Sequence, residues 1–84
     1  PDVARDLNNL AQLLQATNRF AEAEPLMRRS VQILLLFELR TGHEHPNLKA
    51  GMANYRALLA GQGQSPEEVE GLLAALAAEV QARR

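Results

Sequence analysis

The sequence contains no cysteine and no tryptophan, and its aromatic residues are one tyrosine and two phenylalanines. Without cysteine there are no disulfides, thiolate nucleophiles or zinc fingers, and a reducing compartment is favoured, so we expect a cytoplasmic protein. Neither sign of charge predominates, because the chain has nine Lys and Arg residues and ten Asp and Glu residues. A nucleic-acid groove needs clustered basic surface, and the pairs Arg28-Arg29 and Arg83-Arg84 are too small to form one. We therefore expect no nucleic-acid partner.

Long apolar runs are absent as well. No stretch approaches the roughly 20 apolar residues of a membrane-spanning helix, and no charged-then-apolar leader is visible, so we expect no membrane partner. A chain of 84 residues can form one small domain with a marginal core. Because the first residue is Pro1 rather than Met, we expect the chain to be cut out of something longer.

The apolar residues that are present recur at helical spacing. Val3, Leu7, Leu10 and Leu14 are spaced four, three and four apart, which predicts an amphipathic helix with Arg5, Asn8 and Gln12 on the opposite face. Similar patterns follow in three further segments. The sequence thus predicts an all-α fold of four antiparallel helices, at about 2–15, 20–40, 46–60 and 66–82.

Local chemistry predicts where these helices begin and end. Thr41-Gly42 ends the second helix, since glycine adopts the left-handed conformation at no steric cost. Pro46 is expected to open the third helix from its first position. Ser65, with Pro66 and Glu68 after it, predicts a capping box at the start of the fourth helix.

The second helix carries an unbroken apolar run from Ile33 to Phe37. A helix that packs on one side needs an apolar stripe about 100° wide, whereas five consecutive apolar residues surround the axis. This helix is therefore expected to contact neighbours on several sides.

An internal repeat relates the two halves of the chain. An offset of 45 residues aligns the apolar positions of the first helix with those of the third, and Asn9 with Asn54. Such self-similarity is typical of solenoids, in which helical pairs stack to bury their apolar faces. We interpret the chain as two helix-turn-helix units, residues 1–45 and 46–84.

The first unit resembles a known family in three segments. Leu7 to Ala11, Arg19 to Leu26 and Gly42 to Pro46 are similar to the tetratricopeptide repeat variant of kinesin light chains and many bacterial multi-repeat proteins. The resemblance implies an α-solenoid, with Ala11 and Ala23 where the paired helices approach closely and Phe20 closing the turn between them. It also implies a bacterial interaction scaffold.

The second unit departs from this pattern. The variant repeats at about 42 residues, against 34 for the standard repeat, so the offset of 45 implies a longer second helix. Arg56 replaces the Ala11 equivalent, and Ser65 replaces the Phe20 equivalent. We therefore interpret the second unit as degenerate, with its last helix capping the array.

The resemblance implies a function in protein binding. In tetratricopeptide arrays the first helix of each unit lines a concave groove, where asparagine grips the backbone of an extended peptide. The expected partner-binding residues are Arg5, Asn8, Asn9, Gln12 and Asn54. The alternative is a solvated helix face without a ligand.

A second functional hypothesis is self-association. Leu35, Leu36 and Leu39 are expected to remain partly uncovered by the chain's own core and to meet another copy. Apolar patches beyond a few hundred Å² usually mark an interface. In this reading the chain is a structural module that dimerises through the Leu34 to Leu39 surface.

Catalysis and metal binding find little support in the sequence. His43-Glu44-His45 is the one constellation that could bind zinc, but Zn²⁺ needs three or four ligands, and the resemblance makes His45 a turn residue. Ser30 and Ser65 have no assignable base. We expect no enzymatic activity, no metal and no cofactor.

Overall fold

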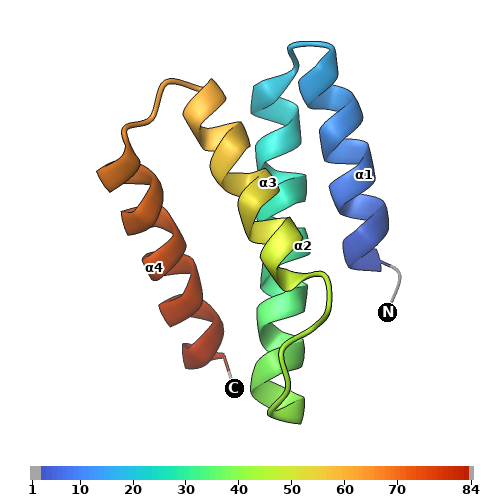
Figure 1. Cartoon of the computed structure of the whole chain (residues 1–84), viewed down its shortest axis with the longest axis vertical. Coiled ribbons are helices and arrows are strands. Elements are labelled where there is room, and N and C mark those ends of the chain that lie inside the picture. Colours follow the sequence, from blue (N-terminus) through green and yellow to red (C-terminus); the bar gives the residue numbers. More distant parts are fainter. Residues whose placement is uncertain (1–2, 84) are drawn as a thin grey trace.

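The computed structural model describes residues 3–83, which form four α-helices without a β-strand among them. The helices are α1 (Val3–Ala16), α2 (Phe20–Thr41), α3 (Leu48–Gly61) and α4 (Pro66–Ala82), joined by short connections (Figure 1). The all-α, four-helix prediction is confirmed. The predicted start of the first helix at Asp2 lies outside the described residues.

Helix α2 is the centre of the fold. It has 22 residues, against 14 in α1 and in α3, and it contacts each of the other three helices. Its residues Met27 and Val31 are fully buried in the main core, where side chains from all four helices meet. The prediction that the second helix has neighbours on several sides is confirmed.

Helices α1 and α2 form a closely packed hairpin. Ala11 and Ala23, the small residues on the two helices, are both fully buried, and Ala4 is nearly so. Small side chains allow the two backbones to approach, and the buried Ser30 hydroxyl of α2 donates a hydrogen bond of 2.7 Å to the carbonyl oxygen of Ala4. Asn18, with a positive φ of 64°, forms the turn between the helices, a conformation that asparagine tolerates.

The face of α1 that packs on α2 differs from its apolar stripe. The buried residues are Ala4 and Ala11, whereas Val3, Leu10 and Leu13 are exposed. Periodicity places the stripe on one side of the helix, but α2 covers the neighbouring side. The consequence is an apolar face of α1 that no described residue covers.

Two local signals around the α2–α3 connection have different outcomes. Gly42 ends α2 in the left-handed conformation, and its N–H donates to the carbonyl of Glu38, as the sequence predicts. The prediction that Pro46 opens the third helix is wrong, because α3 begins at Leu48. Pro46 lies instead in a turn closed by the Leu48 N–H donating to the His45 carbonyl at 3.0 Å.

Helix α4 begins with the predicted capping box. The Ser65 hydroxyl accepts from the Glu68 N–H, and the Glu68 carboxylate accepts from the Ser65 N–H at 2.9 Å. Figure 1 shows α4 running beside the later part of α2, which it contacts. Its buried residues are spaced four, three and four apart along one face: Val69, Leu73, Leu76 and Val80.

The α3–α4 pair does not repeat the packing of the α1–α2 pair. Arg56, at the position equivalent to the buried Ala11, is exposed. Its guanidinium reaches α4 through a surface ion pair in which Nε lies 2.9 Å from Oε2 of Glu70. The Arg56 side chain therefore spans from α3 to α4, whereas Ala11 and Ala23 lie fully buried between α1 and α2.

Candidate functional site

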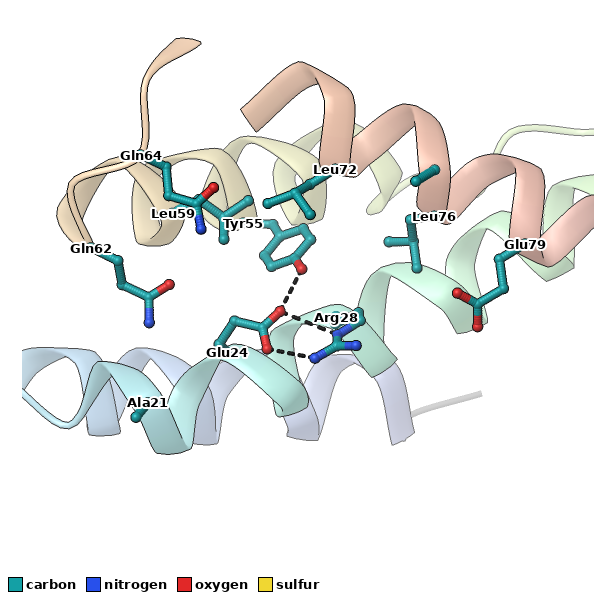
Figure 2. A pocket seen from close by; sticks show the side chains of 11 residues that line it. Ala21, Glu24, Arg28, Tyr55, Leu59, Gln62, Gln64, Leu72, Leu76 and Glu79 are labelled. Carbon is teal, nitrogen blue, oxygen red and sulfur yellow. Dashed lines mark hydrogen bonds and ion pairs between the residues drawn. The ribbon is translucent and has the colours of Figure 1, made fainter. Parts of the chain in front are cut away.

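A hollow of about 420 Å³ opens between α2, α3 and α4 (Figure 2). Its wall is half apolar and half polar, and Tyr55 stands at its centre between Glu24 below and Leu72 of α4 above. Residues from three helices and from the α3–α4 connection line it: Ala21, Glu24, Arg28, Tyr55, Leu59, Gln62, Gln64, Leu72, Ala75, Leu76 and Glu79.

Three side chains in this hollow form a hydrogen-bonded cluster. The Tyr55 hydroxyl of α3 donates to Oε2 of Glu24 of α2 at 2.6 Å. Arg28, one turn after Glu24, donates to both carboxylate oxygens, with Nη2 2.7 Å from Oε1 and Nε 3.2 Å from Oε2. The carboxylate of Glu24 thus accepts three hydrogen bonds and joins α2 to α3 (Figure 2).

The environment keeps Tyr55 protonated. Burial of the ring and the hydrogen bond to Glu24 raise the pKa of the Tyr55 hydroxyl well above its ordinary value. The bond to Glu24 also raises the pKa of Arg28. The Tyr55 hydroxyl therefore keeps its proton and donates it in a hydrogen bond to the Glu24 carboxylate, which links α3 to α2.

A second hollow, of about 210 Å³, lies where α1, α2 and the start of α3 meet. Four of its lining residues are alanine, glycine or leucine, and the other five bring polar groups from α1, α2 and the α2–α3 connection. The lining residues are Ala4, Arg5, Asn8, Ser30, Leu34, His45, Asn47, Ala50 and Gly51.

Two of the predicted groove residues line this second hollow, and Asn54 contacts one of them. Asn54 of α3 donates from Nδ2 to Oδ1 of Asn8 of α1 at 3.2 Å, so one amide pair links the first and third helices. Arg5 and Asn8 line the hollow, whereas Asn9 and Gln12 are exposed and do not. The repeat alignment pairs Asn54 with Asn9, but in the structure Asn54 contacts Asn8.

The hydrogen bonds already made determine which groups remain to face a ligand. Because Oδ1 of Asn8 accepts from Asn54, the Nδ2 group of Asn8 remains a donor. His45, which sequence reasoning treated as a turn residue, accepts the Asn47 N–H on Nδ1 at 3.0 Å. A neutral His45 therefore carries its proton on Nε2. The polar edge of the hollow is rich in donors.

The His43-Glu44-His45 segment forms a connection rather than a ligand cluster. His43 is exposed, while the His45 ring packs edge-to-face on Phe37 with centroids 4.9 Å apart. Over residues 3–83, the structure gathers no group of three or more His, Asp or Glu side chains that could hold a metal ion.

The predicted self-association residues are half-buried. Leu35 packs against the main core and against a second, smaller cluster formed by Ala4, Leu34 and Leu48. Leu39 lies with Leu35 in a small hollow against Ala77 and Val80 of α4, and Leu36 lines a neighbouring hollow beside Val80. This surface thus borders the end of α4, and Phe37 within it is 40% exposed, while the most exposed apolar side chains lie on α1.

Comparison with known proteins identifies no relative: no family model, no curated protein and no solved structure matches this chain. Within the described part of the chain, none of the helices combines the length and apolar character needed to cross a bilayer. Functional inference therefore depends on the geometry of the two hollows and of the exposed α1 face.

Proposed function

We propose that the chain is a non-catalytic, tetratricopeptide-like scaffold of a bacterial cytoplasm that holds an extended segment of a partner protein along the groove between α1 and α3. The observation that carries this proposal is the Asn8–Asn54 hydrogen bond beside the 210 Å³ hollow. It brings together two amides from different helices, and one of them, Asn8, lines the hollow together with Arg5.

The chemistry of the groove suits a peptide backbone. The Asn8 amide offers donors and the Asn54 carbonyl oxygen offers an acceptor, which together match the acceptor and donor of a peptide bond. Ala4, Ala50 and Leu34 give the hollow an apolar wall that suits a small apolar side chain. Gln12, one turn beyond Asn8 on α1, extends the same side of the helix, and Asn9 stays a prediction from the repeat.

A peptide-display screen against the whole chain tests this function. In the Asn8→Ala, Asn54→Ala double variant, peptides selected on the native chain should bind about 5- to 150-fold more weakly, the equivalent of two lost hydrogen bonds. Gln81→Ala, which removes an exposed amide from α4, is the matched control and should bind normally.

Circular dichroism and thermal melting must show that both variants fold. Unchanged affinity in a folded double variant would refute the groove. A separate Asn9→Ala variant then decides whether the partner lies instead along the outer edge of α1, where Asn9 is exposed.

A further inference from the structure

His45, in the connection between α2 and α3, is held in place by a hydrogen bond that requires a neutral ring. Its Nδ1 atom accepts the backbone N–H of Asn47, two residues later in the chain, at 3.0 Å. The ring also packs edge-to-face on Phe37 of α2, with centroids 4.9 Å apart. An imidazole accepts a hydrogen bond only while one of its nitrogens lacks a proton. The bond to Asn47 therefore exists only while His45 is uncharged.

Rotation of the ring cannot replace this acceptor once His45 is protonated. Both nitrogens of an imidazolium carry protons, so every orientation of the ring brings a donor or a C–H group toward the Asn47 N–H. Two donors do not remain 3.0 Å apart, and the charged ring must therefore leave this position. Because Asn47 is exposed, water can satisfy its N–H afterwards. The chain can thus make this change without burying an unpaired backbone donor.

Protonation of His45 also alters the second hollow, because the His45 ring forms part of its wall. The other ionisable residue of that wall is Arg5 of α1, whose Nε atom lies 3.8 Å from Oδ1 of Asp6. This ion pair partly screens the guanidinium, so repulsion between Arg5 and a charged His45 only adds to the loss of the Asn47 bond.

The remaining elements around the second hollow bring no ionisable side chain to its described lining. Helix α2 contributes Ser30 and Leu34, and α3 contributes small side chains. The titratable neighbours in the connection, His43 and Glu44, are both exposed. Histidine is the side chain whose charge ordinarily changes between about pH 5 and 8. His45 is therefore the residue through which mild acid acts on this hollow.

We propose that protonation of His45 releases its ring from Asn47 and Phe37, reshapes the second hollow and weakens the binding of a partner segment in the groove. At neutral pH the ring is fixed in the wall of the hollow and carries its proton on Nε2. In mild acid the ring no longer holds this position, so the α2–α3 connection acts as a pH-sensitive switch. The effect on the partner rests on the proposed function, whereas the movement of the ring does not.

Nuclear magnetic resonance of the whole chain between about pH 7.5 and 5.5 tests the movement of the ring. The amide resonance of Asn47 should shift with the same midpoint as the ring resonances of His45. Nuclear Overhauser effects between the rings of His45 and Phe37 should weaken over the same range. An Asn47 amide that stays unchanged while His45 titrates would overturn the proposal.

Two matched variants assign the transition to His45. His45→Asn supplies a side-chain oxygen that can accept the N–H two residues later at every pH, so the Asn47 amide should no longer shift. His43→Asn removes the exposed histidine of the same connection and should retain the native transition. A transition that persists in His45→Asn, or that disappears in His43→Asn, would contradict the assignment.

Fluorescence anisotropy measures the effect on binding, with a histidine-free peptide selected on the native chain at neutral pH. Its affinity for the native chain should fall about 2- to 10-fold at pH 5.5, the equivalent of one hydrogen bond, and its affinity for His45→Asn should change less than about twofold. Equal or tighter binding to the native chain at pH 5.5 would overturn the regulation of the groove. A screen that yields no peptide would refute the proposed function alone, because the resonance experiment decides the movement of His45 by itself.

Discussion

Tyr55 on α3 and Glu24 on α2, 31 positions apart in the sequence, are joined by a hydrogen bond of 2.6 Å. Tyr55 is 3% exposed, and it is the only tyrosine of the chain. The same ring therefore contributes to the core and connects two helices through its hydroxyl. Because the chain has no tryptophan, the ionisation of this one residue can be followed without interference.

Alkaline pH should unfold the protein through Tyr55. The pKa of its hydroxyl is raised in the folded state above the ordinary value of 10.0, so the unfolded chain loses this proton first. The contribution to stability is complete below pH 10 and is lost as pH rises toward the folded pKa. Ultraviolet absorbance of the phenolate should appear at higher pH in the native protein than in the protein unfolded by urea.

Tyr55→Phe provides the control for the alkaline transition. The variant removes the hydroxyl but keeps the ring, so unfolding should cost about 1.5–3 kcal/mol less at neutral pH, the range for a hydrogen bond to a charged group. Its stability should depend less on pH above 10, the ordinary tyrosine pKa. Identical phenolate titrations of native and unfolded wild-type protein would contradict the buried bond.

Two glycines in helix interiors should respond differently to alanine. Gly71 in α4 has open space around its Cα, so Gly71→Ala should stabilise the protein by about 0.5–1 kcal/mol through lower backbone entropy of the unfolded chain. Gly51→Ala should gain at least about 1 kcal/mol less, because its Cβ would crowd the buried Leu34. Urea unfolding measures both, and equal stabilisation would show that Leu34 moves aside freely.

Removal of the α4 cap should be measurable. Ser65→Ala loses the hydroxyl that accepts from the Glu68 N–H and should lower the free energy of unfolding by about 1 kcal/mol. Hydrogen exchange in the first turn of α4 should accelerate more than exchange in α2. Uniform acceleration in both helices would indicate that α4 opens only with the whole domain.

The capping box of Ser65 and Glu68 also predicts how the stability of the protein changes at acidic pH. The backbone and side-chain hydrogen bonds of Ser65 hold the pKa of Glu68 below 4.5, so its contribution is complete above that pH and is lost as pH falls through the folded pKa. Glu68→Gln should flatten stability against pH in this range. Glu67→Gln, an exposed neighbour outside the capping box, should retain the wild-type slope, and matching slopes in the two variants would exclude the cap as the cause.

The helices could be predicted from the sequence because their signals are local. Gly42 and Ser65 mark ends that depend on a few neighbouring residues, and both behave as predicted. Pro46 was misplaced because proline suits the first turn of a helix and a preceding β-turn equally well. The choice depends on the tertiary position of α3, which no local pattern contains.

The packing partners could not be read from periodicity. The spacing of Val3 and Leu10 shows that they share a face of α1, but not that α2 covers Ala4 and Ala11 instead. The contact of Asn54 with Asn8 could not be predicted for a similar reason. An internal repeat shows which positions are equivalent, but not which residues contact each other. Likewise, Glu24 and Arg28 are visible as a helical pair, whereas the donor Tyr55 comes from a distant segment.

The difference between the two helical pairs gives the final prediction. Ala11 and Arg56 are equivalent in the repeat, yet Ala11 is fully buried between α1 and α2 while Arg56 reaches Glu70 at the surface. Ala11→Val should destabilise the protein by about 1–3 kcal/mol through overpacking, and Ala11→Arg should prevent folding by burying an unpaired charge. Arg56→Ala removes only an exposed ion pair and should cost less than about 1 kcal/mol. Chemical denaturation of Ala11→Val and Arg56→Ala tests this difference even if Ala11→Arg cannot be purified. A cost of Arg56→Ala as large as that of Ala11→Val would mean that Arg56 contributes more than an exposed ion pair.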